Sequence, residues 1–302
     1  MTTQSPPGRL FVFGLGYSAT TLARAAMAAG WQVGGTTRDP AKAEALRGEG
    51  IDALCFDGQT ASREVARALR DATHVLSSVA PPRNGDGALD PVLALHAGDI
   101  IAAPELAWLG YLSTIGVYGN HDGGWVDEAG PPDLTSVRAR TRVTAEAGWQ
   151  ALGATRRLPS QIFRLAGIYG PGRSQLDALR EGRARRIVKS GQVFNRIHVA
   201  DIAGAVMAGM EVARTLLLNV VDDEPAPPQD VVLYGARLLD VAPPREVAFD
   251  EADLSPMARQ FYGANRRVSN AALKSALGYR LRYPTYREGL RAVMDAEAFA
   301  AA

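Results

Sequence analysis

Cysteine is almost absent from this sequence, and so is any grouping of side chains that would hold a metal ion. The only cysteine, Cys55, cannot form a disulfide within the chain. The apolar run around it predicts a packed strand residue rather than a reactive thiol. None of the four histidines lies at ligand spacing from a cysteine or a carboxylate. We therefore expect neither a disulfide framework nor a metal site.

An excess of charge of one sign is lacking as well. The 33 basic and 32 acidic residues leave a net charge of +1, without a basic tract or an acidic tail. Nothing in this balance points to nucleic acid or a membrane surface as a partner. No apolar run approaches the roughly 20 residues that cross a bilayer. The polar start Met1–Gly8 lacks the features of a signal peptide. We expect a cytoplasmic monomer or homodimer whose partner is a small-molecule substrate.

Short apolar runs alternate with helical patterns through the first part of the chain. They predict strands at 10–13, 31–36, 51–56, 74–79 and 108–113, and helices at 18–29, 40–47, 63–70 and 89–103. Such alternation is typical of βαβ units in a parallel sheet that is covered on both faces. The sequence therefore predicts an α/β fold with a doubly wound parallel Rossmann sheet.

The pattern becomes less regular after residue 113. We expect a loop at 118–132, a helix at 134–152, a sixth strand at 161–165 and a turn at 167–173. Further along, we expect a hairpin at 187–193, helices at 199–212 and 229–239, and a strand at 216–221. This organisation predicts a Rossmann core over residues 1–170. A smaller C-terminal α/β lobe, residues 171–302, is interleaved with the end of the core.

The loop that follows the first expected strand has the pattern of a dinucleotide-binding turn. A pyrophosphate needs a tight turn, close backbone N–H groups and the positive end of a helix dipole. Gly14 permits the turn, Gly16 lacks the Cβ that would block the phosphate, and Ala19 takes the place of the third glycine. Tyr17 and Ser18 begin the helix there. These five residues predict dinucleotide binding, with a purely structural turn as the alternative.

The end of the second expected strand indicates which dinucleotide is bound. NAD sites place a carboxylate there to accept a hydrogen bond from the ribose 2′-hydroxyl, whereas an arginine suits the 2′-phosphate of NADP. Here Arg38 follows the strand, and Asp39 comes only after it. The sequence therefore favours NADP, with NAD possible if Arg38 is only a solvated loop residue.

Several segments, in order, resemble the short-chain dehydrogenase/reductase superfamily, and most closely its atypical and extended branch of NAD(P)-dependent epimerase/dehydratase-like proteins. They are Phe56-Asp57, 77–82 (SSVAPP), 113–119 (STIGVYG), 164–173 (RLAGIYGPGR) and 197–203 (IHVADIA), followed by 265–270 (NRRVSN), 277–278 and 283–289. Any one of these segments is weak evidence, but the ordered set is specific.

This resemblance implies roles for matching positions. Asp57 and Gly58 would lie by the adenine. Ser78, Val79 and Ala80 would line the riboses at the carboxyl end of the fourth strand. Thr114 matches the catalytic Ser/Thr that hydrogen-bonds the reacting oxygen, with Ser113 beside it. Tyr169, in the turn after the sixth strand, would lie near the nicotinamide.

The chain departs from the family at its acid/base pair. Relatives carry a tyrosine and, four residues later, a lysine on the helix after the fifth strand. Counting back from Glu146 places Arg142 at the lysine position and Arg138 at the tyrosine position. Arg142 keeps a positive charge for the nicotinamide ribose. Arg138 cannot act as an acid or base, because a guanidinium keeps its proton, but it suits a substrate carboxylate or phosphate.

The sequence does not name a replacement for the tyrosine. Tyr118, Tyr169, His198 and Tyr262 are candidates, each with a strong alternative as a packing residue. Asn195 and Arg196 are placed to reach a substrate. The basic cluster at 180–189 either recognises a nucleotide or forms a solvated face. At least one of Arg266 and Arg267 is expected to form a structural ion pair.

Two functions remain open at this point. One is an NAD(P)-dependent oxidoreductase, epimerase or dehydratase that acts on a nucleotide sugar or another polar carbonyl or alcohol compound. Retention of Ser113, Thr114 and the Tyr169 turn favours this enzyme. The alternative is a non-catalytic NADP(H)-binding redox sensor or regulatory module, which the missing tyrosine favours.

Overall fold

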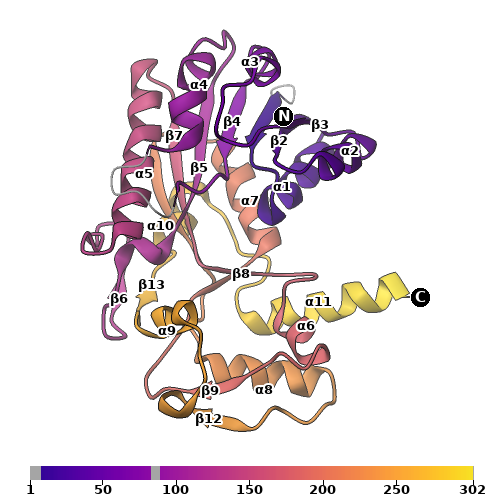
Figure 1. Ribbon diagram of the computed structural model, residues 1–302, viewed down its shortest axis with the longest axis vertical. Helices are drawn as coiled ribbons and strands as arrows, with labels where there is room; N and C mark the ends of the chain where they lie inside the picture. The colour runs from indigo at the N-terminus through magenta and orange to yellow at the C-terminus, as the bar shows by residue number, and fades with distance from the viewer. Residues whose placement is uncertain (1–7, 83–88, 302) are drawn as a thin grey trace. The chain divides into compact units, whose positions relative to one another are not determined.

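In the computed structural model, the described residues are 8–82 and 89–301 (Figure 1). The start of the chain, for which we expect no signal peptide, lies outside them apart from Gly8. Within the described residues, no helix combines the length and the apolar character needed to pass through a membrane. The same residues contain no group of three histidine, cysteine or acidic side chains that could hold a metal ion.

A seven-stranded sheet carries the glycine loop and the expected cofactor residues. Its strand order is β11-β7-β5-β4-β1-β2-β3, and β3, β2, β1, β4 and β5 pair in parallel. The strands are β1 (Arg9–Phe13), β2 (Gln32–Thr37), β3 (Asp52–Cys55), β4 (His74–Ser77), β5 (Trp108–Thr114), β7 (Ser160–Leu165) and β11 (Leu216–Val220). This topology confirms the predicted doubly wound parallel Rossmann sheet.

Helices cover both faces of this sheet, as the near-continuous apolar character of its strands requires. Helices α3, α4 and α5 contact one another in sequence on one face, and α1 and α7 lie on the other (Figure 1). The helices are α1 (Tyr17–Ala28), α2 (Pro40–Gly48), α3 (Arg63–Leu69), α4 (Pro91–Ile101), α5 (Val137–Thr155) and α7 (Val199–Met210), with a 3₁₀ turn, η1 (Ile115–Tyr118).

The remaining elements form three two-stranded parallel sheets and a set of helices. The sheets pair β8 (Gly167–Tyr169) with β10 (Arg196–His198), β9 (Arg186–Val188) with β12 (Glu246–Ala248), and β6 (Trp125–Val126) with β13 (Arg267–Val268). The helices are α6 (Gln175–Arg180), α8 (Pro228–Leu238), α9 (Pro256–Tyr262), α10 (Ala271–Leu277) and α11 (Tyr286–Ala301), with a 3₁₀ turn, η2 (Phe249–Glu251).

The expected hairpin at 187–193 is wrong. Strand β9 pairs in parallel with β12, which lies about sixty residues later in the chain, and Lys189 and Gln192 form a tight turn after β9 instead. A parallel pair cannot be closed by a short loop, so local turn residues gave no signal for this partner.

The chain divides into two compact units, and each is built from three separate segments. The first unit contains the described residues up to Val117, with Leu134–Arg164 and Ile202–Leu218. The second contains Tyr118–Asp133, Leu165–Asp201 and Asn219–Ala302. These units are defined by contacts within the chain and do not test the expected domain division at residue 170. That division stays a prediction.

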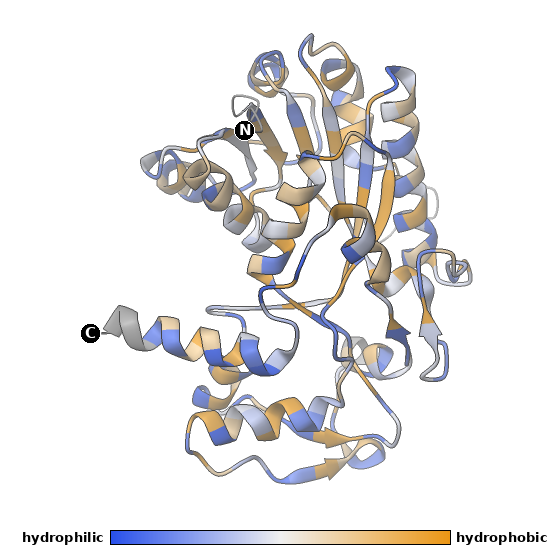
Figure 2. Cartoon of the chain, turned by 180° about the vertical axis from the view of Figure 1, so that it is seen from behind, coloured by the Kyte–Doolittle hydropathy of each residue, from blue (hydrophilic) through white to orange (hydrophobic). Residues whose placement is uncertain are grey.

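Buried apolar side chains form the cores of the two units. The strands of the main sheet are coloured mostly as hydrophobic in Figure 2, and α11 alternates between hydrophobic and hydrophilic residues. In β1, residues Leu10 to Phe13 are fully buried.

Cys55 lies in a strand as expected, but the expectation that it is packed is wrong. Its side chain is exposed, because β3 is the last strand at one edge of the sheet.

Candidate functional site

The carboxyl ends of five neighbouring parallel strands meet at one edge of the main sheet. Each of these strands is followed by residues that the sequence singled out: β3 by Asp57, β2 by Arg38, β1 by Gly14, and β4 by Ser78, while β5 ends at Thr114. Ligands of doubly wound proteins bind at this edge. The first unit therefore brings together most of the predicted cofactor residues.

The glycine loop is built by its backbone. Gly14 has φ of +83°, a conformation that costs little only for glycine. Its N–H donates to the Thr36 hydroxyl at 3.0 Å, and the Leu15 N–H donates to the Thr36 carbonyl at 2.6 Å. A Cβ on Gly14 would lie 3.0 Å from the side chain of Val79. Thus β2 and the segment after β4 both fix the shape of the loop.

Gly16 differs from Gly14 in what surrounds it. It is exposed, and among the described residues a Cβ placed there would meet only the Gly14 carbonyl, at 3.9 Å. Gly16 is also the N-cap of α1, and no side chain caps that helix. In contrast, Asp39, Ser62, Asp90 and Ser136 cap α2, α3, α4 and α5. The start of α1 therefore combines open space with a helix end that lacks a side-chain acceptor.

The charged residues after β2 and β3, Arg38, Asp39 and Asp57, are exposed. No hydrogen bond or ion pair of the Arg38 side chain occurs within residues 8–82 and 89–301. The Asp39 carboxylate accepts from the N–H groups of Ala41 and Lys42 at 2.9 and 3.3 Å, so it serves the start of α2. Asp57 accepts from the Gln59 N–H at 2.8 Å, which shapes the turn that contains Gly58. Of the two charged side chains after β2, Asp39 is engaged in hydrogen bonds to α2, whereas Arg38 has no partner among the described residues.

Ser113 and Thr114 at the end of β5 have different surroundings. Ser113 is buried, and its hydroxyl donates to Oε1 of Glu146 at 2.5 Å. Arg164 on β7 completes this cluster, because its Nη2 and Nε donate to Oε2 and Oε1 of Glu146 at 2.7 and 3.1 Å. Thr114 is only half-buried, and its Oγ1 accepts from the Gly116 N–H at 3.0 Å. The Ser113 hydroxyl donates a hydrogen bond, whereas the Thr114 hydroxyl donates none within the described residues.

Arg138, Arg142 and Glu146 share one face of α5 at intervals of four residues, as their spacing predicts. Along this face the side chains change from exposed to half-buried to buried. The Nη1 atom of Arg142 donates to the phenol oxygen of Tyr111 at 2.9 Å and to the Leu112 carbonyl at 3.3 Å. Sequence patterns do not single out Tyr111, because it lies within an apolar strand run.

Three predicted residues belong to the second unit, where each has partners in the fold. Tyr169 is buried, and its hydroxyl donates to the Thr285 carbonyl at 3.4 Å. The Asn195 amide donates to the Arg266 carbonyl at 3.0 Å and accepts from the Val268 N–H at 2.8 Å. The roles of Tyr169, Asn195 and Arg196 toward a ligand stay predictions.

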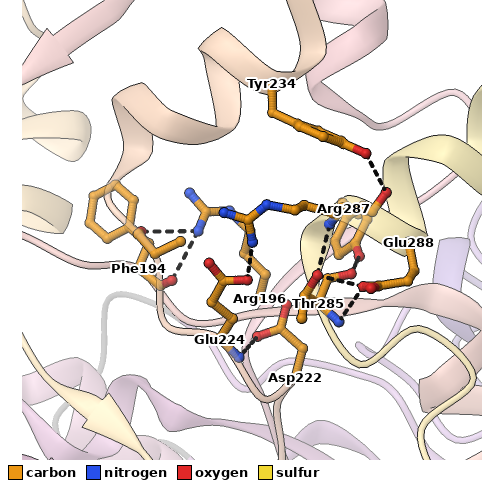
Figure 3. Close-up of polar contacts among 10 residues, drawn as sticks. Phe194, Arg196, Asp222, Glu224, Tyr234, Thr285, Arg287 and Glu288 are labelled. Atoms are coloured by element: carbon orange, nitrogen blue, oxygen red, sulfur yellow. Dashed lines mark hydrogen bonds and ion pairs between the residues drawn. The ribbon is translucent and has the colours of Figure 1, made fainter. Parts of the chain in front are cut away.

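Arg196 lies in the polar cluster drawn in Figure 3. Its Nη1 donates to the carbonyls of Phe194 and Ala226 at 3.0 and 3.1 Å. Burial raises the pKa of the nearby Asp222 carboxyl well above its ordinary value, and the charge of Arg196 opposes this shift. In the same view Arg287 forms an ion pair with Glu224. Sequence reasoning missed these carboxylates, because their partners lie far along the chain.

The four candidates for an acid/base residue are all buried in the second unit. The Tyr118 hydroxyl donates to Asn219 at 2.8 Å. His198 accepts at Nδ1 from the Ala200 N–H, and burial lowers its pKa to about 4. Burial raises the pKa of Tyr169 and of Tyr262. None of these shifts brings a group toward neutral pH, where a general acid or base works best.

Other charged residues that the sequence singled out have structural partners. Arg266 and Arg267 donate to the carbonyls of Gly119 and Gly123 rather than forming the expected ion pair. In the cluster at 180–189, the partners are Glu297 for Arg180, Glu181 for Arg183, the Asp253 carbonyl for Arg185, Glu246 for Arg186 and the Tyr262 carbonyl for Lys189. These contacts support the reading of the cluster as a solvated face.

The fold and the glycine loop define a Rossmann-type protein, and solved structures extend this description. A functionally unknown conserved protein from Silicibacter pomeroyi is 48% identical, with a TM-score of 0.84 over 96% of this chain and 99% of its own. MoeE5 in complex with UDP-glucose and NAD is 20% identical, with a TM-score of 0.74 over 98% and 100%. Human epimerase family protein SDR39U1 with NADPH is 17% identical, with a TM-score of 0.70 over 95% and 99%.

The chain belongs to the same family as the Silicibacter pomeroyi protein, and its fold is that of the epimerase-like, atypical short-chain dehydrogenase/reductases. The resemblance inferred from the sequence is thereby confirmed. No family model matches the chain.

Two curated proteins are similar to the chain in sequence. A 3-diazoavenalumate denitrifying reductase from a Streptomyces species is 32% identical over 181 residues, and this match spans about half of each protein, 55% of both. Protein YeeZ from Escherichia coli strain K12 is 26% identical over 287 residues, which cover 91% of this chain and 96% of YeeZ.

Proposed function

We propose that the chain is an NAD(P)-dependent oxidoreductase of the epimerase-like type that binds NADP in preference to NAD. The start of α1 is the observation that carries this proposal. Gly16 leaves open space beside a helix end without a side-chain cap, and a pyrophosphate fits such a place through backbone N–H groups and the helix dipole. The solved complexes with NAD and with NADPH of proteins of the same fold support this reading.

The first unit supplies a group for each part of the cofactor. Tyr17, Ser18 and Ala19 continue the phosphate loop into α1. Arg38 would bind the 2′-phosphate, and the turn containing Asp57 and Gly58 would lie by the adenine. Ser78, Val79 and Ala80 would line the riboses. Arg142 would donate to the nicotinamide ribose, and a bound nicotinamide supplies hydride transfer.

The residues at the substrate end orient a substrate but do not move a proton in the usual way. The half-buried Thr114 hydroxyl is placed to hydrogen-bond a substrate oxygen. Arg138 is exposed at the start of α5 and suits a carboxylate or phosphate, but its guanidinium cannot act as an acid. The proposed substrates are a nucleotide sugar or another polar carbonyl or alcohol compound whose reaction tolerates this loss.

The curated reductase suggests a reaction that needs no tyrosine. Its name describes a reduction of a diazo compound with loss of nitrogen. When hydrogen replaces a diazonium group as a hydride, the C–N bond breaks, N₂ leaves, and no alkoxide forms that would need a proton. A chain with Arg138 at the tyrosine position retains what such a reaction requires: a bound cofactor and a positioned substrate.

A non-catalytic NADP(H) sensor is the second candidate function. The observation that favours it is the burial of every candidate acid/base residue, each engaged in the second unit. A substrate panel distinguishes the two functions. It combines NADPH or NADH with nucleotide sugars, polar carbonyl compounds and an arenediazonium salt, and cofactor oxidation is followed by absorbance. Turnover of any substrate supports the enzyme, whereas tight cofactor binding with no turnover supports the sensor.

Cofactor binding itself is tested by Gly16→Val. The new side chain would enter the space of the pyrophosphate, and its Cβ would lie no closer than 3.9 Å to any described atom, so we expect cofactor binding to disappear while cooperative unfolding remains. The measurement is the increase in melting temperature on adding NADPH or NADH.

The matched control is Gly48→Val at the end of α2, where an added Cβ has no described atom within 4 Å. This variant should keep the cofactor-induced increase in melting temperature. If Gly16→Val keeps it as well, the phosphates bind elsewhere and the proposal is wrong.

A further inference from the structure

We propose that Tyr111 is a positioning residue, whose phenol oxygen holds the guanidinium of Arg142 in place for the nicotinamide ribose. This inference rests on the proposed binding of a nicotinamide dinucleotide. It adds a residue that neither the sequence pattern nor the family's usual tyrosine–lysine pair would indicate. Tyr111, Arg142 and the residues that hold them lie on β5, α4 and α5, all within the first unit.

The hydrogen bonds of Arg142 leave part of its guanidinium available. Nη1 donates both to the Tyr111 oxygen, at 2.9 Å, and to the Leu112 carbonyl, at 3.3 Å. Across residues 8–82 and 89–301, Nε and Nη2 make no hydrogen bond. Neither is among the buried polar atoms that lack a partner, so neither nitrogen is fully buried. These two nitrogens carry three N–H groups in one plane, a geometry that suits a pair of neighbouring oxygens. The two hydroxyls of a ribose form such a pair.

Tyr111 is itself held rigidly. It is fully buried, and its ring stacks on Trp149 with centroids 6.0 Å apart and an angle of 15° between the planes. The Trp149 Nε1 donates to the buried carboxylate of Asp90 at 3.4 Å, and Asp90 caps α4. Burial raises the pKa of the Tyr111 phenol, so the phenol stays neutral and its oxygen keeps a lone pair for Arg142.

An anchor matters for a long, flexible side chain such as that of Arg142. The arginine side chain loses conformational entropy when it is fixed. Among the described residues, no carboxylate forms an ion pair with Arg142, so Tyr111 and the Leu112 carbonyl are what restrict it. A guanidinium that is already fixed loses less entropy when the ribose binds.

The test is Tyr111→Phe, which removes the oxygen and keeps the ring that stacks on Trp149. The dissociation constants of NADPH, NADH and ADP are measured by calorimetric titration. We expect about tenfold weaker binding of the dinucleotides, the effect of one hydrogen bond to a charged donor. Binding of ADP should stay unchanged, because ADP has the adenosine and both phosphates but no nicotinamide ribose. A general structural defect would weaken all three ligands.

Arg142→Ala and the double variant complete the test. Arg142→Ala should weaken dinucleotide binding at least as much as Tyr111→Phe, and adding Tyr111→Phe to it should cause no further loss, because the phenol acts through Arg142. Unchanged dinucleotide binding in Tyr111→Phe, equal loss for ADP, or additive losses in the double variant would each overturn the positioning role. If the unmodified protein binds neither NADPH nor NADH, the proposed function fails and this inference fails with it.

Discussion

At the scale of single residues, the two charged side chains after β2 differ in their contacts. Asp39 accepts from two N–H groups of α2, whereas Arg38 is exposed and makes no hydrogen bond or ion pair in the described part of the chain. The sequence placed an arginine where NADP proteins need one, and the structure adds that its acidic neighbour is engaged as a helix cap. This arrangement supports, without testing it, the preference for the 2′-phosphate.

Arg38→Ala tests this preference. A guanidinium–phosphate contact is worth on the order of 1–3 kcal/mol. We therefore expect the unmodified protein to bind NADP at least about tenfold more tightly than NAD, and Arg38→Ala to remove most of this difference. Titration calorimetry of both cofactors with both proteins measures it. As a control, Arg70→Ala, an exposed arginine at the far end of α3, should keep the difference. Equal affinities for the two cofactors in the unmodified protein would contradict the prediction.

Spacing along the chain predicted part of the residue-level geometry, and tertiary contacts decided the rest. The interval of four residues placed Arg138, Arg142 and Glu146 on one face of α5, because helix geometry fixes it. The contacts of Tyr111 and Arg164 could not be read this way. Both lie in strands whose neighbours are apolar, and their partners are 31 and 18 residues away. A polar residue in a buried strand is nevertheless a useful signal that a buried partner exists.

At the scale of elements, Glu146 connects three of them. It receives hydrogen bonds from Ser113 at the end of β5 and from Arg164 on β7, while it lies on α5 itself. All three residues are at most 5% exposed. Removing one partner of a buried ion pair leaves the other charge without compensation, which costs far more than losing a surface pair.

Glu146→Gln should therefore lower the free energy of unfolding by about 3–5 kcal/mol. The measurement is a denaturant titration followed by circular dichroism. Glu44→Gln is the matched control, because Glu44 pairs with Arg47 on α2 and its side chain is 77% exposed. It should change stability by less than about 1 kcal/mol. A similar small effect for both variants would show that the buried cluster does not stabilise the sheet.

The sequence predicted elements well where their partners are local. In the first part of the chain, short apolar runs that alternate with helical patterns predicted each strand and helix to within about two residues. The failure at 187–193 has a clear cause, since β9 finds its partner β12 about sixty residues later. Such a pairing depends on the path of the whole chain, which local turn residues do not report.

At the scale of the whole molecule, the buried His198 and the half-buried His74 tie stability to pH. Burial lowers the pKa of His198, in the second unit, and of His74, in the first, from an ordinary 6.5 to about 4. Between these two values, the unfolded chain binds protons that the folded chain does not. The free energy of unfolding therefore falls as pH falls from 6.5 towards 4, by up to about 1.4 kcal/mol per pH unit for each histidine. The raised pKa of Asp222 acts in the opposite direction.

His198→Gln isolates one of these contributions. The difference in unfolding free energy between the unmodified protein and this variant should shrink by about 2–3 kcal/mol between pH 7 and pH 4, because only the unmodified protein pays for keeping His198 neutral. Denaturant titrations at several pH values in this range measure it. Parallel pH profiles of the two proteins would contradict the assignment of His198 as a buried neutral histidine.

The place of β11 in the main sheet has a consequence for synthesis on the ribosome. β7 ends at Leu165, but its outer neighbour β11 begins only at Leu216. While the intervening residues are being made, the nascent sheet ends at β7, with an edge of unpaired N–H and C=O groups that other chains can join. Translation through this stretch is thus a period in which the newly made sheet is open to aggregation at β7.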